Sequence, residues 1–519
     1  MELLYLTKHK TRKQSRCSRA LLMLGLLAGN LLFFLTIWMA SKYDKVTLDQ
    51  FIYQLKSSAA GANSSITQSA VVRVGVFGVA ATILELLLYK LCSGDVRQNL
   101  RQRGIYIRFR ATKFARFVSR RALALTVAVL VFSMALFTVK LNLIQFVSAA
   151  ATESEFIADH YVDPRLAKLT FPAHKRNLVY IFLESMENTF GETEAGGPIY
   201  DNFIPELTRL AEENVNFSND DGLGGALSFS GTTWTAAAMV TQTSGLNVQV
   251  PLDAEYFGGE NGYMPGVVSL DELLEDQGYN QTLLVGSDAE FGGREAYFTE
   301  HGNYNIVDTK VLKDRGWLPK DYNVWWGFED AKLFGAAKLE LAALAAQGEP
   351  FNFTMLTCDT HFPDGYHCQF CQDEYPEQYP TVTRCSSRMV YDFIRWIQEQ
   401  PFYENTTIII SGDHLTMDPD FMREVDENYQ RTIYNCIINA PVEPVQEKNR
   451  EFGTYDLFPT TLAALGVQIE GDRLGLGTNL FSGKQTLCEM YGFEVLDWEL
   501  LKRSKFYNTR FLGLGDVES

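Results

Sequence analysis

The sequence predicts an α/β domain built around a largely parallel sheet and preceded by three membrane-spanning helices. The first observation is that strand-like apolar runs alternate with helical patterns after residue 175, an order typical of a parallel sheet flanked by helices. The second is a set of three apolar stretches before residue 140, each close to the roughly 20 residues that a helix needs to cross a bilayer. The chain of 519 residues is long enough for both parts.

The three apolar stretches cover residues 20–40, 70–91 and 122–139. A basic segment precedes the first stretch, as in a cleaved signal peptide, but the apolar run is long for such a signal and two more follow it. We therefore interpret all three as membrane helices. Glu85 lies inside the second one, where an acidic residue is a candidate functional group, although the sequence identifies neither a partner nor a role for it.

Basic residues predict the orientation of these helices. Six Lys or Arg precede the first helix and nine lie between the second and the third, whereas residues 41–69 hold three lysines and two aspartates. Because cytoplasmic segments carry an excess of Lys and Arg, we expect the N-terminus and the 93–121 loop in the cytoplasm. Three crossings then leave everything after residue 140 outside. The predicted parts are a membrane anchor (1–140), a linker (141–175) and an extracytoplasmic domain (176–519).

Charge is divided unevenly between these parts. Of the 46 Lys/Arg and 63 Asp/Glu, residues 1–121 hold 20 and 5, so the remaining residues hold 26 and 58. A strongly acidic outer part would repel phosphate backbones, so nucleic acid is excluded as an expected partner. The basic excess of the first part flanks the apolar helices, and the lipid bilayer is therefore the expected partner there.

Six of the eight cysteines are expected outside the cytoplasm: Cys358, Cys368, Cys371, Cys385, Cys436 and Cys488. Four of these crowd into residues 358–385. Disulfides persist in an oxidising compartment, so we favour bridges here, with a pairing that the sequence leaves open. A zinc site built from the four crowded thiolates is the alternative.

Polar residues follow four of the expected strands. The strands cover residues 178–183, 282–285, 353–357 and 406–410. Helical patterns are found at 204–213, 269–277, 331–346 and 389–398. In open parallel sheets, ligands bind at the carboxyl ends of the strands. The residues expected at that edge are Glu184, Gly286–Asp288, Cys358–His361 and Ser411–His414.

Two of these strand ends together suggest a metal site. Glu184 ends one strand, and Asp413 and His414 follow another. Two carboxylates and an imidazole suit a divalent ion such as Mn²⁺ or Zn²⁺. Each motif alone could equally be structural, because an Asp-His pair at a strand end is often a cap and a surface residue. Their presence in one domain favours a shared ion.

The segment Phe229–Met239 predicts a loop that opens into a helix. The helix would present free backbone N–H groups and its positive end to an anion. A threonine there, such as Thr232, could attack phosphorus if a metal ion lowered the pKa of its hydroxyl. The alternative is that the threonines of this loop only cap the helix.

Five segments carry a resemblance to a known family. They read NLVYIFLESME at 177–187, SGTTWT at 230–235, CDTHFPDGY at 358–366, SGDH at 411–414 and YDLFPTTL at 455–462. In them the chain resembles the phosphoglycerol transferases of the alkaline phosphatase/sulfatase superfamily, which include lipoteichoic acid synthases. The chain is more similar still to the enzymes that add phosphoglycerol to periplasmic glucans. The sequence of residues 46–55 also resembles that group.

The resemblance implies a sulfatase-like fold and a set of site residues. Glu184, Thr232, Asp413 and His414 would hold one divalent ion, Mn²⁺ in related synthases with Zn²⁺ or Mg²⁺ possible, and Thr232 would be the nucleophile. His361 would contact the phosphoglycerol and exchange protons. Two further positions concern substrate: Arg294 matches a basic substrate-binding residue, whereas Gly292 replaces an aromatic residue of the teichoic acid enzymes.

The resemblance also implies a reaction and a location. Phosphoglycerol would pass from phosphatidylglycerol through a phosphothreonine to a glycan or polymer acceptor, and diacylglycerol would be released. The protein would be a multi-pass protein of a bacterial cell membrane with its catalytic domain outside the cytoplasm. The sequence does not identify the acceptor.

Three other functions are considered. Phosphoethanolamine transfer uses the same fold and type of nucleophile, but the Asp359–Gly365 run favours the glucan type. Sulfatases need Cys or Ser in Cys/Ser-x-Pro-x-Arg, and no such run surrounds Thr232. An inactive, membrane-tethered binding protein would be expected to have lost some of the site residues.

Overall fold

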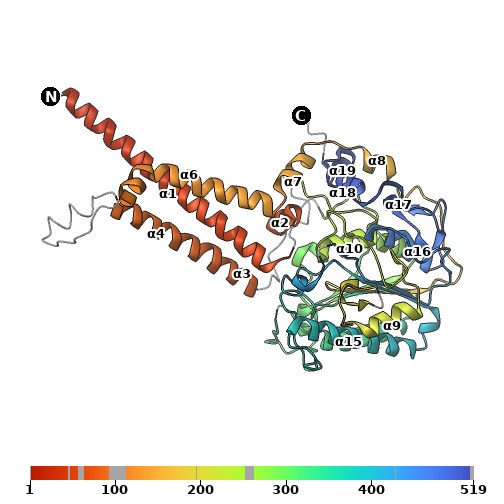
Figure 1. The fold of residues 1–519 in the computed structure, drawn as a ribbon. Helices are drawn as coiled ribbons and strands as arrows, with labels where there is room; N and C mark the ends of the chain where they lie inside the picture. The colour runs from red at the N-terminus through yellow and green to blue at the C-terminus, as the bar shows by residue number, and fades with distance from the viewer. Residues whose placement is uncertain are drawn as a thin grey trace. The chain divides into compact units, whose positions relative to one another are not determined.

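The computed structural model describes residues 2–44, 47–56, 64–92, 113–193, 196–251, 262–325, 327–426 and 428–514. Most of the basic loop predicted at 93–121 lies outside this described part. The chain divides into two compact units (Figure 1). The first comprises Met1–Tyr43 and Asn63–Ile144, and the second comprises Asp44–Ala62 and Gln145–Ser519.

The first unit contains three helices long and apolar enough to cross a membrane. They are Ala20–Lys42, Ile66–Lys90 and Arg121–Lys140, with mean hydropathies of 2.3, 2.1 and 2.5. They lie in α1 (Glu2–Lys42), in a run of α3 (Ser64–Ala70), a π-helical segment (Val71–Val76) and α4 (Phe77–Cys92), and in α6 (Lys113–Lys140). The three predicted apolar helices are thus confirmed.

Glu85 has a partner within this unit that the sequence does not reveal. The Asn30 side-chain amide on α1 donates to Glu85 Oε2 at 2.8 Å and to Thr82 Oγ1 at 3.1 Å on α4. Hydrogen bonds between amides and carboxylates of this kind link neighbouring helices in an apolar environment. We therefore interpret Glu85 as part of the contact between α1 and α4.

A six-stranded sheet forms the centre of the second unit, in the order β4-β3-β5-β2-β6-β7. In that order the strands are Asn305–Val307, Asn280–Val285, Phe351–Leu356, Asn177–Leu183, Thr406–Gly412 and Asn435–Ile438. All neighbours are parallel except β7, which runs antiparallel to β6. Every residue of β2 is buried, which explains why the strand reads as one continuous apolar run. The predicted mostly parallel sheet is confirmed.

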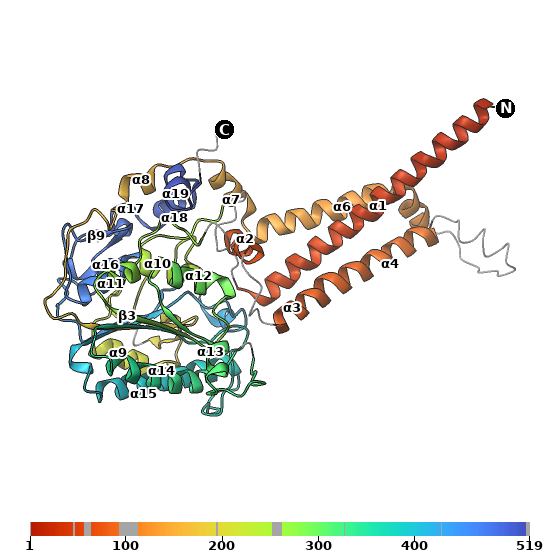
Figure 2. The ribbon, with the colours of Figure 1, turned by 180° about the vertical axis from the view of Figure 1, so that it is seen from behind.

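Helices cover both faces of this sheet (Figure 2). One face carries α9 (Pro205–Glu213), α14 (Asp330–Ala345) and α15 (Gln378–Gln398). The other carries α10 (Thr235–Ser244), α11 (Leu270–Glu275), α12 (Arg294–Glu300) and α16 (Leu457–Ala464). A layer of helices on each side of a parallel sheet is the α/β architecture that the alternating pattern predicts.

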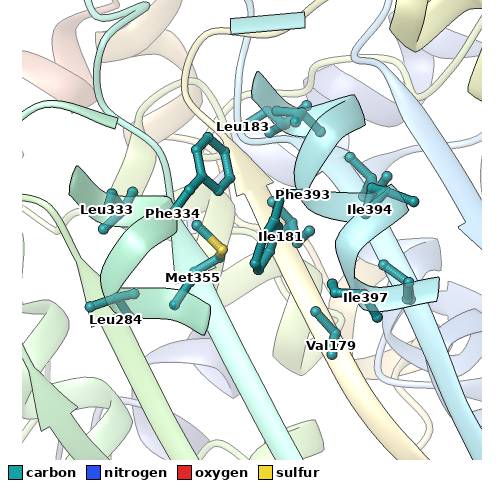
Figure 3. Packing of buried hydrophobic residues seen from close by; sticks show 14 of the residues in the cluster. Val179, Ile181, Leu183, Leu284, Leu333, Phe334, Met355, Phe393, Ile394 and Ile397 are labelled. Carbon is teal, nitrogen blue, oxygen red and sulfur yellow. The ribbon is translucent and has the colours of Figure 1, made fainter. Parts of the chain in front are cut away.

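The apolar core beneath α14 and α15 holds the first of these layers in place (Figure 3). Ile181 of β2 and Met355 of β5 face Phe334 of α14 and Phe393 of α15, and all four side chains are buried. Burying a side chain of this size contributes roughly 1.5–3 kcal/mol. The core therefore fixes the central strands, and with them the loops at their carboxyl ends.

Two segments that the sequence assigns to the anchor and the linker contribute elements to the second unit. Residues 44–56 contain α2 (Leu48–Lys56). Residues 145–175 contain most of α7 (Leu143–Ala150), then α8 (Phe156–His160) and β1 (Leu169–Thr170), which pairs with β8 (Gln468–Ile469). The unit ends with a short β9–β10 pair (Arg473–Leu474, Gly477–Thr478) and the helices α17 (Leu487–Tyr491), α18 (Phe493–Leu501) and α19 (Lys505–Arg510).

Candidate metal centre

Three buried ligand groups converge where β2 and β6 end side by side. Glu184 directly follows β2, and Asp413 and His414 directly follow β6. His414 Nε2 lies 3.5 Å from Glu184 Oε1 and 3.4 Å from Asp413 Oδ2. One ligand atom from each residue lies within 4.8 Å of the others. The structure thus brings together three of the four predicted metal ligands.

Backbone groups hold these side chains in place. Ser185 bends the chain after β2 with a φ of +53°, and its N–H donates to Asp413 Oδ1 at 2.7 Å. The His414 N–H also donates to Asp413 Oδ1, at 2.7 Å. His414 Nδ1 lies 2.9 Å from the Leu415 carbonyl, which can only accept. Nδ1 therefore carries a proton, which leaves Nε2 as the ring atom that can bind a cation.

The cluster fits a divalent cation. Asp413 Oδ2 is buried and has no hydrogen-bond partner among the described residues. Burial, and then the nearby Glu184 carboxylate, raise the pKa of Asp413 to about 7. Two buried carboxylates are unfavourable without a compensating positive charge. Two carboxylates and one imidazole nitrogen suit Mn²⁺ or Zn²⁺, which would supply that charge.

Two hydroxyls contact this cluster: Ser185 donates to Glu184 Oε1 at 2.7 Å, and Thr235 lies between Glu184 and His414. Thr235 Oγ1 lies 3.3 Å from Glu184 Oε2 and 3.3 Å from His414 Nε2. The predicted nucleophile, Thr232, is instead bound within its own loop, where its hydroxyl donates to the Phe229 carbonyl at 2.8 Å and accepts from the Phe229 N–H at 3.1 Å. Among the described residues, Thr232 makes no hydrogen bond to the cluster.

The path of the loop explains this difference. Gly231 adopts a φ of +77°, which turns the chain after Ser230, and Trp234 is extended at the N-cap of α10. Thr235 is the first residue of the helix, and no threonine caps it through its side chain. The 10-residue helix α10 therefore begins at the metal cluster, and its first N–H groups are available to an anion.

Arg294 is a buried cation close to this cluster. It is the first residue of α12 and is 3% exposed. Its guanidinium donates to Ser287 Oγ at 2.9 Å and to the carbonyls of Asp288 and Phe291 at 2.8 and 3.0 Å. Burial lowers its pKa, and the Glu184 charge opposes this effect. Arg294 is thus held rigidly near the cluster, as a residue that contacts an anionic substrate would need to be.

His361 lies in the loop that follows β5. Its Nδ1 is 2.6 Å from the Phe362 carbonyl, and its ring stacks on Phe362 and meets the edge of Trp325. Removal from water lowers the pKa of His361 to about 4, with smaller effects from the charges of His414 and Asp413. The ring is therefore neutral near pH 7, with Nε2 as its basic nitrogen.

Residues of α2, which the sequence did not single out, pack against the loop that precedes α10. Tyr53 of α2 is fully buried, and its ring centroid lies 5.0 Å from that of Trp234. The Tyr53 hydroxyl donates to the Gly292 carbonyl and lies 2.9 Å from the Tyr263 hydroxyl. Gly231 also donates a backbone hydrogen bond to Asp49 of α2. The helix α2 thus contacts both the Thr235 loop and the turn before Arg294.

The same segment reaches the loop after His414. The Asp44 N–H donates to the Met417 carbonyl at 2.9 Å. Arg431 pairs with Asp44 at 3.0 Å and with Glu187 at 2.6 Å, and Glu187 also accepts from the Thr416 N–H at 2.7 Å. Glu187, the second carboxylate of the 177–187 motif, is therefore engaged in an ion pair. The resemblance of residues 46–55 to glucan-modifying enzymes was the only signal for this segment.

Comparison with known proteins places this site in a family. Residues 176–467 match the family described as Sulfatase. The chain is 30% identical over 342 residues to phosphoglycerol transferase I of Salmonella choleraesuis (strain SC-B67) and of Salmonella typhi, covering 64% of this chain and 42% of each relative. The chain therefore spans less than half the length of these curated relatives.

Two solved structures are among those similar to this chain. The lipoteichoic acid synthase LtaP from Listeria monocytogenes is 18% identical, with a TM-score of 0.48 over 64% of this chain and 82% of that chain. The lipooligosaccharide phosphoethanolamine transferase A from Neisseria meningitidis is 12% identical, with a TM-score of 0.47 over 85% and 83%. The Sulfatase family match covers more than half of the residues of the present chain, which therefore belongs to the sulfatase family.

Proposed function

We propose that this protein is a membrane-anchored, metal-dependent transferase that moves phosphoglycerol from phosphatidylglycerol to a glycan or polymer acceptor. The observation that carries the proposal is the position of the Thr235 hydroxyl, 3.3 Å from both Glu184 and His414 at the start of α10. Membership of the sulfatase family and the similarity to proteins named phosphoglycerol transferase I support the reaction class.

In this proposal Thr235 replaces Thr232 as the nucleophile. Glu184, Asp413 and His414 hold the divalent ion, for which we propose Mn²⁺ from the donor set, and Thr235 is the hydroxyl beside it. A bound cation would lower the pKa of that hydroxyl and offset the charge of the phosphate. Thr232 keeps a supporting role, because its hydrogen bonds to Phe229 fix the loop.

Two displacements at phosphorus complete the reaction. Thr235 Oγ1 loses its proton and attacks phosphorus, the bond to the diacylglycerol oxygen breaks, and that oxygen takes up a proton. An acceptor hydroxyl then loses its proton and attacks the same phosphorus, the bond to Thr235 breaks, and Thr235 Oγ1 takes up a proton. The N–H groups of α10 and the guanidinium of Arg294 stabilise the phosphate oxygens, while His361 supplies and removes the protons.

The membrane anchor suits a lipid donor. The positive-inside pattern supports a cytoplasmic N-terminus and an extracytoplasmic catalytic domain in a bacterial cell membrane. A phosphatidylglycerol headgroup stays at the bilayer surface, and the diacylglycerol product stays in the bilayer. An enzyme tethered to that membrane therefore needs no soluble carrier for either lipid.

The proposal is tested with the full chain in phosphatidylglycerol vesicles, with Mn²⁺ and with or without a periplasmic-type glucan. We expect release of diacylglycerol and transfer of labelled phosphoglycerol to the glucan. Vesicles of phosphatidylethanolamine and a sulfate ester serve as competing substrates. Preferred turnover of phosphatidylethanolamine would replace the proposal by phosphoethanolamine transfer, and preferred cleavage of the sulfate ester would replace it by sulfatase activity.

The contact between α2 and the Thr235 loop leads to a prediction about Tyr53. Tyr53→Ala removes the ring that packs on Trp234, so we expect kcat to fall by roughly 10- to 100-fold, because small displacements of a nucleophile have effects of this size. KM should change less, since Arg294 and the helix start still bind phosphate. The measurement is the separate determination of kcat and KM for diacylglycerol release.

A matched variant separates this effect from general destabilisation. Tyr434 is also fully buried, but its hydroxyl donates to the Leu207 carbonyl on the opposite face of the sheet. Tyr434→Ala should lower the free energy of unfolding by a similar amount, roughly 3–5 kcal/mol, and leave kcat of the folded protein unchanged. Equal losses of kcat in both variants would contradict a specific role for α2.

A further inference from the structure

We propose that Cys368, Cys371 and Cys385 bind a zinc ion at a second site, separate from the candidate metal centre. All six described cysteines of the second unit are free thiols, so the bridges favoured from the sequence are not formed. These three converge, with one sulfur atom from each within 4.8 Å of the others. This inference is independent of the proposed transferase activity.

The sulfur–sulfur distances match zinc coordination. Cys368 Sγ lies 3.7 Å from Cys371 Sγ and 3.8 Å from Cys385 Sγ. A tetrahedral Zn²⁺ with Zn–S bonds of about 2.3 Å places its sulfur ligands about 3.8 Å apart. A disulfide would need about 2.05 Å. Both distances from Cys368 Sγ thus match the spacing of ligands around one ion, and the third pair lies within 4.8 Å.

Backbone N–H groups donate to two of the three sulfur atoms. The Phe370 N–H donates to Cys368 Sγ at 3.4 Å, and the Cys368 N–H donates to Cys371 Sγ at 3.3 Å. Thiolates are the form in which cysteine binds metals.

The fourth predicted thiolate is not part of this group. Cys358 Sγ lies 3.2 Å from the Phe328 carbonyl and 3.4 Å from Asp330 Oδ1, in a separate buried cluster. No fourth His, Cys, Asp or Glu joins the three thiolates within the part of the chain that the structure describes. We therefore expect three protein ligands, with a water molecule as the fourth.

The site joins two elements of the catalytic unit. Cys368 and Cys371 lie in the segment between β5 and α15, which also carries His361, whereas Cys385 lies on α15. Tyr379 in the first turns of α15 bonds the Thr360 carbonyl at 3.0 Å, and Thr360 in turn bonds the Glu184 carbonyl at 2.5 Å. A bound ion would therefore fasten the His361 loop to a helix that packs on the sheet.

The test begins with the metal content of the full chain, purified in detergent without added metal. We expect about one equivalent of zinc that persists in Glu184→Gln, which weakens the other site, and is lost in Cys385→Ser. Cys436→Ser removes a different buried thiol and should leave the zinc in place. Loss of zinc in Glu184→Gln with retention in Cys385→Ser would overturn the proposal.

Two measurements on the unchanged protein test the site without relying on variants that could misfold. Replacement of zinc by Co²⁺ should give thiolate-to-cobalt charge-transfer absorption, which a site of carboxylates and imidazole does not produce. Chelation should make three more thiols reactive to an alkylating agent. Peptide mass spectrometry without reduction that finds two of the three cysteines in a disulfide, or copper bound in place of zinc, would overturn the proposal.

Discussion

Thr235→Ala is expected to lower kcat for diacylglycerol release by roughly 10⁴-fold or more, the scale seen when a covalent nucleophile is removed. The reason is that Thr235 Oγ1 is the hydroxyl within hydrogen-bonding distance of Glu184 and His414. Thr235→Ser keeps a hydroxyl at the start of α10 and should retain a measurable rate. The rates are compared by steady-state release of diacylglycerol from phosphatidylglycerol vesicles.

Thr232→Ala is the matched control, because it changes the same type of residue three positions away in the chain. It removes two hydrogen bonds to Phe229, which should lower the free energy of unfolding by about 0.5–1.5 kcal/mol per bond. Its kcat should fall far less than that of Thr235→Ala. A Thr232→Ala variant that is folded and inactive beside an active Thr235→Ala would show that Thr232 is the nucleophile.

Asp413→Asn is expected to abolish the stabilisation that Mn²⁺ gives to the protein. In the unchanged chain, Mn²⁺ at 100 times its Kd should raise the free energy of unfolding by about 2.7 kcal/mol. The substitution removes the charge of Asp413, whose Oδ2 has no hydrogen-bond partner among the described residues and is therefore available to the ion. The melting temperature is measured with and without Mn²⁺, so the result does not depend on activity.

Glu187→Gln provides the contrast for this second prediction. Glu187 lies three residues after Glu184, but it pairs with Arg431 at 2.6 Å. Breaking a buried ion pair costs about 3–5 kcal/mol, so this variant should melt earlier than the unchanged chain. It should nevertheless gain the full increment on addition of Mn²⁺. Loss of that increment in Glu187→Gln with retention in Asp413→Asn would contradict the assignment of the ligands.

The sequence predicts the sheet and its edge well because both follow from strong local signals. The apolar run of β2 is buried on both faces, and Glu184 ends that run at the edge where β6 also ends. The two strands are separated by more than 200 residues, yet parallel pairing brings their carboxyl ends together. Glu184, Asp413 and His414 are therefore brought together as predicted.

The choice between Thr232 and Thr235 needs the backbone path. They are three residues apart, Thr232 in the loop and Thr235 at the first position of α10, and in the sequence both resemble helix-capping threonines. Only the turn at Gly231 and the extended Trp234 decide which hydroxyl faces the cluster. The position of Thr235 directly before the run Ala236–Val240 is a weak signal for the first turn of the helix, where an anion would bind.

Long-range packing also conceals α2 and the cysteine group from sequence reasoning. Tyr53 and Trp234 are 181 residues apart in the sequence, and no local pattern reports that their rings pack together. Four crowded cysteines suggest one site, but Cys358, two residues after the end of β5, donates instead to Asp330 on α14. The spacing of the other three becomes meaningful only once α15 places Cys385 against the preceding loop.

The most direct test of the central claim is to capture the phosphorylated intermediate. The full chain is incubated with phosphatidylglycerol and Mn²⁺ without an acceptor, digested, and examined by fragmentation mass spectrometry of the peptide that contains residues 230–235. We expect the added mass of phosphoglycerol on Thr235, and its absence from Asp413→Asn. Modification of Thr232 instead, or release of diacylglycerol with no modified threonine, would contradict the account.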